Sequence, residues 1–567
     1  MHRNLRMNKQ KGRTRAQEST GAIERMYITM RHLFNRGFYK PCGVSGDSLR
    51  QSLLLLRPEI YGTVAENKTE LNGLTYVLDR LPEGIEQCRY IILISDEGYR
   101  KSAFKPIIPP KRRRNCYRID NEQMNIEITR GRSDIYDILT HLTFLYIEAD
   151  KIKDRVLFEE TNEVTRDWQK VEQILSKDKI SRAERQVALI HVANILGRTF
   201  DEALEAHKTF ATKENPEKFL RVIYWLGRIA IEEHTLGLKR SIEFSQVLRE
   251  RLGHHIHGDI WATNIKKTLK NQHLLERPIH IISANMHSVM NSIFATKVLK
   301  EKLPDKTNLE IYQMLSLPEN DEYRQMVKSY AENNGMTFIK DLSGTNIDVQ
   351  IFDTALIDFT NTDYSNITAL EESEKPVLFV MDYAFGEQAY ETIDEFLKPY
   401  KRNGKKAKFL NIASVSIMGK AGILEGSKGD LMIPNAHIFE GTADNYPFKN
   451  ELSKADFEGN GLKVFEGSMV TVLGTSLQNK DLLKFFHNST WNVIGLEMEG
   501  AHYQKAIQSA SRIRKSISEN VKVRYAYYAS DNPLETGSTL ASGGLGTTGV
   551  KPTYLITLKI LQQIFNS

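Results

Sequence analysis

The chain has 567 residues, several times the length that one hydrophobic core usually spans, so we expect two or three domains. Its 41% hydrophobic and 26% charged residues are close to the averages of folded proteins, and its net charge of +6 is small for this length. These values exclude a largely disordered or fibrous chain. No run approaches the roughly 18 consecutive apolar residues that span a bilayer, and the N-terminus lacks the apolar stretch of a signal peptide, so we expect a cytoplasmic protein with no membrane partner.

Two short segments concentrate positive charge. Residues 1–15 form a basic tail that we expect to be disordered and solvated, and residues 111–114 follow two prolines and are interpreted as a solvated turn. Either segment could contact nucleic acid or a phosphate, although we do not expect nucleic acid as a partner. The three cysteines, Cys42, Cys88 and Cys116, are odd in number and lack metal-ligand spacing, which predicts reduced thiols and no metal or other cofactor.

Residues 16–275 show mainly the apolar spacing of three and four residues that is typical of helices. They predict a mainly α-helical N-terminal region whose role the sequence does not reveal. Its clearest helix carries an apolar stripe that ends at Gly197, and residues 199–202 then form a capping box that opens the next helix. The stretch GHHIHGD (253–259) holds three histidines, but adjacent histidines rarely converge on one metal ion, so we interpret it as a plain loop.

The pattern changes near Pro278. HIISAN (280–285) and NIDVQIFDTALID (346–358) are typical of short buried strands, so residues 276–370 are either a small α/β segment or an extension of the next domain. The polar segment 361–375 is the best linker candidate. After Pro376, strands and helices alternate, which predicts an α/β domain over residues 371–567 with a mixed sheet covered by helices. The helix after Glu499 is the clearest, because apolar residues at 503, 507, 510, 513 and 517 share one face.

Carboxylates stand at the ends of two of these strands. Strand NVIGLEM (492–498) leads into Glu497 and Glu499, and strand VRYAYYA (523–529) leads into Ser530 and Asp531. Burying carboxylates is costly unless they find partners, and ligands of α/β sheets bind at the carboxyl ends of the strands. One helix separates the two strands, which predicts a right-handed βαβ unit whose strand ends can share a cleft. The alternatives are an early-turn helix carboxylate for Glu499 and a turn cap for Asp531.

A glycine-containing segment follows another strand. Gly419-Lys420-Ala421-Gly422 could bring backbone donors and an ammonium close to an anion or a ribose, and the alternative is a tight turn. We predict that Lys420 recognises the 5′-phosphate of a nucleotide, with a solvent-exposed side chain as the alternative.

Three blocks together resemble the nucleoside phosphorylase superfamily, especially its purine nucleosidase branch of methylthioadenosine/adenosylhomocysteine nucleosidases and AMP nucleosidases. MGKAGIL with GDLMIPNAHIFEGTADNYPF resembles the family's glycine turn and Gly-Asp strand, GLEMEGAHY its Glu-Met-Glu motif, and YYASDNPL its Ser-Asp motif. The resemblance covers about the last 195 residues and implies a homo-oligomer.

The resemblance implies a role for each matching residue. Glu499 binds the ribose hydroxyls, Met498 packs beside the sugar and Glu497 lies close by as a further catalytic carboxylate. Asp531 protonates the leaving purine, and Ser530 orients Asp531. The family's first strand delivers a water-activating glutamate, and because VLFVMD (377–382) leads to Glu387 we assign Glu387 this role, with Asp382 as the alternative. Cleavage of a purine–ribose bond needs an acid for the base, carboxylates around the cationic sugar and a base for water.

The implied function is therefore hydrolysis of the N-glycosidic bond of a purine nucleotide or nucleoside, with AMP favoured. The block around Lys420 contains no arginine of the kind that phosphorylases use for inorganic phosphate, which favours hydrolysis over phosphorolysis. Two alternatives stay open: a phosphate-dependent purine nucleoside phosphorylase, and a non-catalytic protein that senses a nucleoside or nucleotide.

Overall fold

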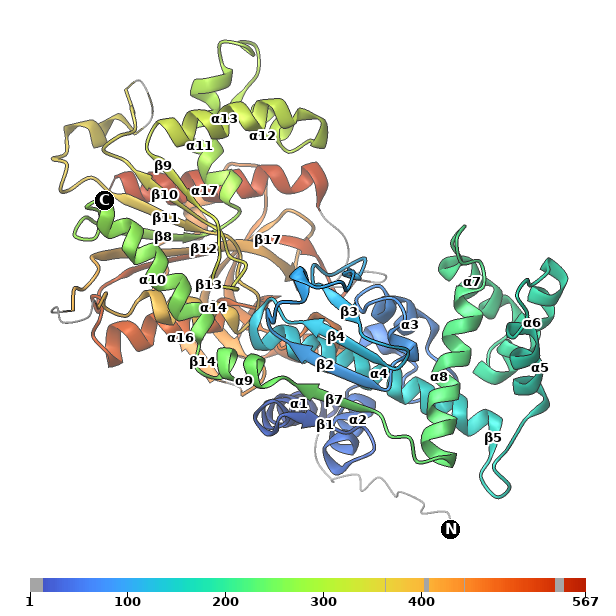
Figure 1. The fold of residues 1–567 in the computed structure, drawn as a ribbon. Helices are drawn as coiled ribbons and strands as arrows, with labels where there is room; N and C mark the ends of the chain where they lie inside the picture. Colours follow the sequence, from blue (N-terminus) through green and yellow to red (C-terminus); the bar gives the residue numbers. More distant parts are fainter. Residues whose placement is uncertain are drawn as a thin grey trace. The chain divides into compact units, whose positions relative to one another are not determined.

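A computed structural model describes residues 14–360, 362, 364–401, 407–442, 444–535 and 545–566. The chain divides into two compact units (Figure 1). Unit 1 comprises Met1–Glu127, Tyr136–Arg249 and Ser476–Phe485, and unit 2 comprises Ile128–Ile135, Glu250–Thr475 and Phe486–Ser567. The predicted basic tail lies outside the described residues except for its last two, and Arg15 already begins the first helix. None of the described helices is long and apolar enough to cross a membrane.

Unit 1 is rich in helices, as expected, but it also contains a sheet. Among its described residues five strands pair in the order β1-β7-β2-β4-β3. These strands are two to five residues long, too short for their alternation to stand out from the helical spacing around them. The helices are α1 (Arg15–Arg36), α2 (Val44–Leu56), α3 (Leu71–Leu78), α4 (Gly131–Val156), α5 (Arg166–Leu175), α6 (Arg182–Leu196), α7 (Phe200–Phe210), α8 (Lys218–Thr235) and α9 (Gln246–Gly253). The strands are β1 (Phe38–Tyr39), β2 (Tyr90–Ile94), β3 (Cys116–Arg118), β4 (Gln123–Glu127) and β7 (Ser241–Phe244), and β5 (Leu157–Phe158) pairs with β6 (Glu163–Val164).

Over residues 16–275 the local structure agrees with one sequence prediction and differs from two others. Helix α6 ends at Gly197 in the left-handed conformation, and Thr199 and Glu202 form the predicted capping box of α7. The histidine stretch is not a plain loop, because His255 is the N-cap of α10 (Ile256–Asn271) and His257 is buried in that helix. The basic segment 111–114 is not simply a solvated turn either. Arg112 and Arg114 both form ion pairs with a carboxylate of α4, and the second arginine is buried.

Unit 2 is built on one mixed sheet. Its described strands pair in the order β14-β13-β15-β16-β12-β8-β11-β10-β9, and β17 pairs with both β12 and β13. Their bounds are β8 (Ile279–Ser283), β9 (Met336–Ile339), β10 (Val349–Asp353), β11 (Val377–Met381), β12 (Ile412–Ile423), β13 (Leu431–Phe439), β14 (Asp444–Pro447), β15 (Val464–Thr471), β16 (Val493–Glu497) and β17 (Lys522–Asp531). The mixed sheet with covering helices is the fold class that the sequence predicts for this region.

Helices cover both faces of this sheet (Figure 1). Helices α10, α14 (Gln388–Phe396) and α16 (Gly500–Gln508) form one core, and α11 (Met286–Leu299), α12 (Asn308–Leu315), α13 (Asp321–Asn333) and α17 (Val550–Phe565) form the other. Alternate residues of β11 face the two cores, since Val377, Phe379 and Met381 belong to the first and Leu378 and Val380 to the second. Every side chain of β11 is therefore apolar.

The boundary expected at residue 371 falls inside this sheet. Strand β8 pairs in parallel with β11 on one side and with β12 on the other. Residues 276–370 are thus an extension of the α/β unit, and the segment 361–375, as far as it is described, connects β10 to β11 within unit 2. Sheet pairing between distant segments leaves no local mark in a sequence, so the sequence alone could not choose between a separate segment and an extension.

Two local predictions in unit 2 are wrong. Gly419 to Gly422 neither follows a strand nor forms the alternative tight turn, because strand β12 runs through it to Ile423 and pairs with β17 along its length. Helix α16 is shorter than its apolar spacing suggests, because a π turn follows at Ser509–Ile513. A π turn needs one more residue than an α turn and rotates the following side chains. Ile513 is accordingly 78% exposed instead of facing the sheet.

Candidate functional site

The end of β12 brings the two predicted carboxylate segments together. Gly422 is the register partner of Leu496 in β16 and of Asp531 in β17, where the β12–β17 register shifts by one residue. Gly495, the β16 residue before this pair, has no room for a side chain because the Gly422 carbonyl oxygen would lie in contact with it. The carboxyl ends of β16 and β17 therefore lie on either side of the end of β12. The two strands run antiparallel to each other, so they do not form the predicted βαβ unit.

Asp531 is the last residue of β17 and is 1% exposed. Its Oδ1 accepts a hydrogen bond from the Ser530 hydroxyl at 2.5 Å, and the same hydroxyl lies 3.1 Å from the Ala421 carbonyl oxygen. Its Oδ2 is buried with no hydrogen-bond partner among the described residues. Burial raises the pKa of Asp531, opposed by the Ser530 hydrogen bond and by the charges of Lys428 and Lys420. The carboxyl group thus has one oriented oxygen and one that is available to a ligand.

Glu497 is a fixed carboxylate at the end of β16. One oxygen contacts the Thr471 hydroxyl, and the other accepts the backbone N–H groups of Glu499 and Gly500. Its Oε1 also lies 3.5 Å from Nδ1 of His437 in β13. Burial by itself would raise the pKa of Glu497, but His437, Thr471 and the backbone donors together lower it. These contacts favour the ionised form of Glu497, which orders the start of α16.

Glu499, the N-cap residue of α16, differs from Glu497 because its pKa is raised. Its Oε1 accepts the backbone N–H of Gly386 at 3.0 Å. Burial and the neighbouring charge of Glu497 raise the pKa of Glu499 to about 8, although Gly386 and Arg130 act against this shift. The two carboxyl groups of the Glu-Met-Glu motif are thus set to different protonation states near neutral pH. Met498 between them is partly buried.

Glu387 lies at the start of α14, in the loop that follows β11. Its Oε1 forms an ion pair of 3.2 Å with Arg132, and its backbone N–H donates to the Ser133 hydroxyl at 2.9 Å. The first strand of this sheet in chain order is β8, and residues 284–291 after it contain no carboxylate. The prediction that Glu387 follows the first strand of the sheet is therefore wrong. Asp382 directly follows β11, is partly buried, and its Oδ1 accepts the Tyr383 N–H.

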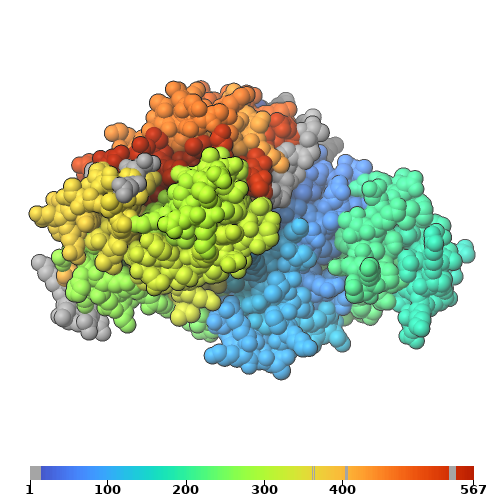
Figure 2. Space-filling view, turned by 90° about the horizontal axis from the view of Figure 1, so that it is seen from above, coloured from blue at the N-terminus to red at the C-terminus, as the bar shows by residue number. Residues whose placement is uncertain are grey.

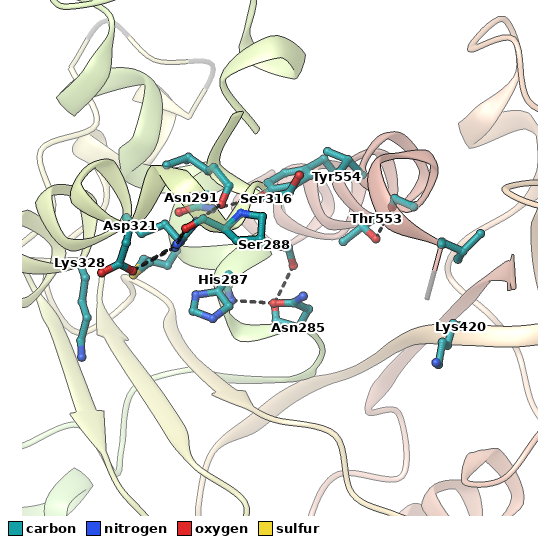
Figure 3. Close-up of a pocket in the computed structure, with 18 of the residues that line it drawn as sticks. Asn285, His287, Ser288, Asn291, Ser316, Asp321, Lys328, Lys420, Thr553 and Tyr554 are labelled. Atoms are coloured by element: carbon teal, nitrogen blue, oxygen red, sulfur yellow. Dashed lines mark hydrogen bonds and ion pairs between the residues drawn. The ribbon is translucent and has the colours of Figure 1, made fainter. Parts of the chain in front are cut away.

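A cavity of about 630 Å³ opens beside this edge of the sheet (Figure 3). Lys420 and Tyr528, register partners in β12 and β17, line it on one side. Helix α11 contributes His287 and Ser288, α13 contributes Lys328, and α17 also borders it. In Figure 3, His287 and Asn285 lie between Lys420 and Lys328. Figure 2 shows the surface of α12 and α13 in yellow-green beside that of α17 in red.

The cationic groups of the cavity differ in availability. Arg324 donates to the backbone carbonyls of Leu315, Leu317 and Pro318, so its guanidinium is committed to the α12–α13 connection. The exposed side chain of Lys420 has no ion-pair partner among the described residues, and its charge acts on Asp531. Lys420 thus lines the cavity and also acts electrostatically on Asp531, the predicted acid.

The sequence reasoning missed several residues of this region. His437, Arg132 and Ser133 were not singled out, and neither was any cavity residue from α11, α13 or α17. Each reaches the site from a distant part of the chain, and single polar residues in amphipathic segments give no separate signal. The described residues contain no group of three or more histidine, cysteine, aspartate or glutamate side chains that could hold a metal ion.

Unit 2 is therefore an α/β unit that gathers carboxylates at the carboxyl ends of its strands, beside a cavity with cationic side chains. A model of DUF6909, described as a family of unknown function, matches residues 47–303 and 307–566, so the chain belongs to this family. The search of curated proteins finds no match.

The chain is also similar to several solved structures. One is the 5′-methylthioadenosine/S-adenosyl homocysteine nucleosidase of Campylobacter jejuni, with 13% identity over 51% of this chain and 100% of that chain and a TM-score of 0.30. Futalosine hydrolase of Helicobacter pylori has 12% identity, covers 51% and 99% of the two chains, and has a TM-score of 0.30. Isoform 2 of uridine phosphorylase from Schistosoma mansoni has 10% identity, covers 51% and 88%, and has a TM-score of 0.30.

Proposed function

We propose that unit 2 hydrolyses the N-glycosidic bond of a purine nucleotide such as AMP and releases the free base. The observation that carries this proposal is the buried carboxyl group of Asp531, which has one oxygen oriented by Ser530 and the other without a partner among the described residues. A purine leaves its sugar as an electron-rich base, and a carboxylic acid with a raised pKa can protonate it as the bond breaks.

The carboxyl groups of β16 suit the sugar. In the transition state the ribose gains positive charge, and that charge favours the ionised form of a neighbouring carboxyl group. Glu499, whose pKa is raised to about 8, can hold a ribose hydroxyl in the ground state and gain negative character as the sugar becomes cationic. Glu497 is fixed by three hydrogen-bond donors and keeps the start of α16 in place. Met498 packs beside the sugar in this arrangement.

The cavity beside Lys420 suits an anionic substituent. The ammonium of Lys420 is available to a phosphate, and Gly419 and Gly422 let the backbone of β12 approach the substrate. A phosphate bound there would be close to the acid, because the charge of Lys420 already acts on Asp531. This placement supports a nucleotide as the substrate over a nucleoside.

For the activation of water we favour Asp382 over Glu387. The ion pair with Arg132 stabilises the charged form of Glu387 and weakens it as a base. Asp382 follows β11 directly, and its charge acts on His287, a residue that lines the cavity. Glu387 then has a structural role in the loop, and Asp382→Asn should reduce turnover more than Glu387→Gln does.

Purified protein incubated with AMP, adenosine, inosine, GMP and methylthioadenosine, each with and without inorganic phosphate, tests the proposal. Chromatography of the products should show free adenine from AMP in both buffers. Release of no base from any substrate would refute the proposal.

Phosphorolysis is a second candidate. Residues 284–291, directly after β8, contain no carboxylate to activate water, and the cavity is lined by Lys420 and Lys328, which suit a phosphate ion. Base release that depends strictly on inorganic phosphate would favour it.

A further inference from the structure

The loop of residues 382–387, between β11 and α14, borders the candidate site and is held from two sides. On one side, the N–H of Gly386 donates to Glu499 at 3.0 Å. On the other side, the N–H of the next residue, Glu387, donates to the Ser133 hydroxyl at 2.9 Å. Consecutive peptide groups thus connect the Glu-Met-Glu motif to the first turn of α4, a segment more than two hundred residues away in the sequence.

The backbone of this loop is fitted to Ser133. Gly386 has a φ of 55°, and a Cβ atom built there would collide with the Ser133 hydroxyl. Only glycine adopts this conformation without strain and leaves room for the hydroxyl. The position of the Gly386 N–H, and with it the partner of Glu499, therefore depends on Ser133.

Arg132 and Arg130 hold the same loop through their side chains. The Arg132 guanidinium joins Glu387, at 3.2 Å, to the carbonyl oxygen of Leu252, also at 3.2 Å. The Arg130 guanidinium lies over the ring of Phe385, 5.4 Å from its centre. The side chains and the backbone of the loop are thus fixed by one short segment, residues 128–135, which belongs to unit 2 although the rest of α4 belongs to unit 1.

We propose that Arg132 and Ser133 are positioning residues of the active site, and that they act on Glu499 through the loop of residues 382–387. This inference rests on the proposed function. It gives the N-terminal half of the chain a role that its sequence does not reveal: the first turn of α4 completes a site whose other parts lie after residue 250.

The test uses Ser133→Ala, Arg132→Met and Arg132→Lys in the full chain. Arg277→Met and Ser511→Ala serve as matched controls. Arg277 forms a buried ion pair with Asp353 at 2.7 Å. The hydroxyl of Ser511, in the π turn, donates to the Ile507 carbonyl at the end of α16, and both contacts lie outside the candidate site. Loss of positioning should lower kcat with AMP by about tenfold or more in Ser133→Ala and Arg132→Met, with a smaller rise in KM. Arg132→Lys should recover part of the loss.

A pH profile separates positioning from general stability. The Gly386 N–H lowers the pKa of Glu499, so a displaced loop should move the limb of the kcat/KM profile due to Glu499 to higher pH in Ser133→Ala. The two control variants should keep the wild-type profile. If Ser133→Ala and Arg132→Met match the controls in kcat and in pH profile, the proposal is overturned.

Hydrogen exchange provides a readout that does not need turnover. In Ser133→Ala the N–H of Glu387 loses its acceptor, so residues 382–390 should exchange faster, and the start of α16 should follow because Glu499 loses its fixed partner. If the wild-type protein releases no base, the proposed function fails. Hydrogen exchange then still tests whether Ser133 holds the loop of residues 382–387 against Glu499. Faster exchange in both segments supports the coupling, and unchanged exchange in either segment overturns it.

Discussion

Replacing Asp531 with asparagine removes the proton that Asp531 is proposed to donate to the leaving base and keeps the shape of the side chain. The amide oxygen can still accept the hydrogen bond that the Ser530 hydroxyl donates at 2.5 Å. The amide nitrogen takes the place of an oxygen that already lacks a partner among the described residues. We therefore expect a change of less than about 1 kcal/mol in the free energy of unfolding.

The effect on turnover should be much larger. A positioned general acid contributes about 10²–10⁴-fold, or about 3–5 kcal/mol of activation free energy. Because burial raises the pKa of Asp531, the wild-type activity should also fall as the pH rises through that pKa, and this limb of the profile should be absent from any residual activity of the variant.

The assay is the initial rate of adenine release from AMP, with thermal unfolding measured on the same samples. Ser530→Ala is the companion variant and should lose less activity, because it removes the orienting hydrogen bond and keeps the acid. If Asp531→Asn keeps more than about a tenth of the wild-type rate, a loss of only ~1.4 kcal/mol, the general-acid role is wrong.

Three further predictions test the sugar, the phosphate and the packing. The proton on Glu499 stabilises the folded protein below its ordinary pKa of 4.5, and this contribution disappears as the pH rises to about 8, so Glu499→Gln should gain stability relative to wild type over that range in denaturant titrations. The same variant should raise KM and lower kcat, and unchanged kinetics would leave Glu499 as a structural carboxylate. Lys420→Met should raise the KM for AMP by roughly ten- to a hundredfold and barely change that for adenosine, and equal effects on both substrates would contradict the phosphate role. Gly500→Ala should lower the free energy of unfolding by about 1–3 kcal/mol, because the new methyl group would collide with His437, and an unchanged value would show that the ring moves freely.

The sequence predicted the strands that carry the carboxylates well. Strands β16 and β17 are apolar runs that end in carboxylates, β11 is an apolar run followed directly by Asp382, and their observed bounds lie close to the predicted ones. Such local patterns are strong because a strand buried on both faces leaves little choice of residue. The prediction that β16 and β17 form a right-handed βαβ unit is wrong, because β12 pairs with β16 in antiparallel and with β17 in parallel, but both strands reach Gly422.

The remaining features depend on contacts that no local pattern encodes. The sequence did not indicate that the glycines of β12 lie inside a strand, because glycine marks turns more often than it marks the close approach of neighbouring strands. The place of β8 at the centre of the sheet follows only from its pairing with β11 and β12. Arg132 and Ser133 meet Glu387 across more than 250 residues, and nothing near them in the sequence indicates that contact.

The most direct test of the central claim is to quantify both products from AMP in a phosphate-free buffer. We expect adenine and ribose 5-phosphate to form in equal amounts, at a rate proportional to the concentration of wild-type enzyme, and we expect Asp531→Asn to release both at least about a hundredfold more slowly. Intact AMP after prolonged incubation, or products that form equally fast with the Asp531→Asn protein, would contradict it.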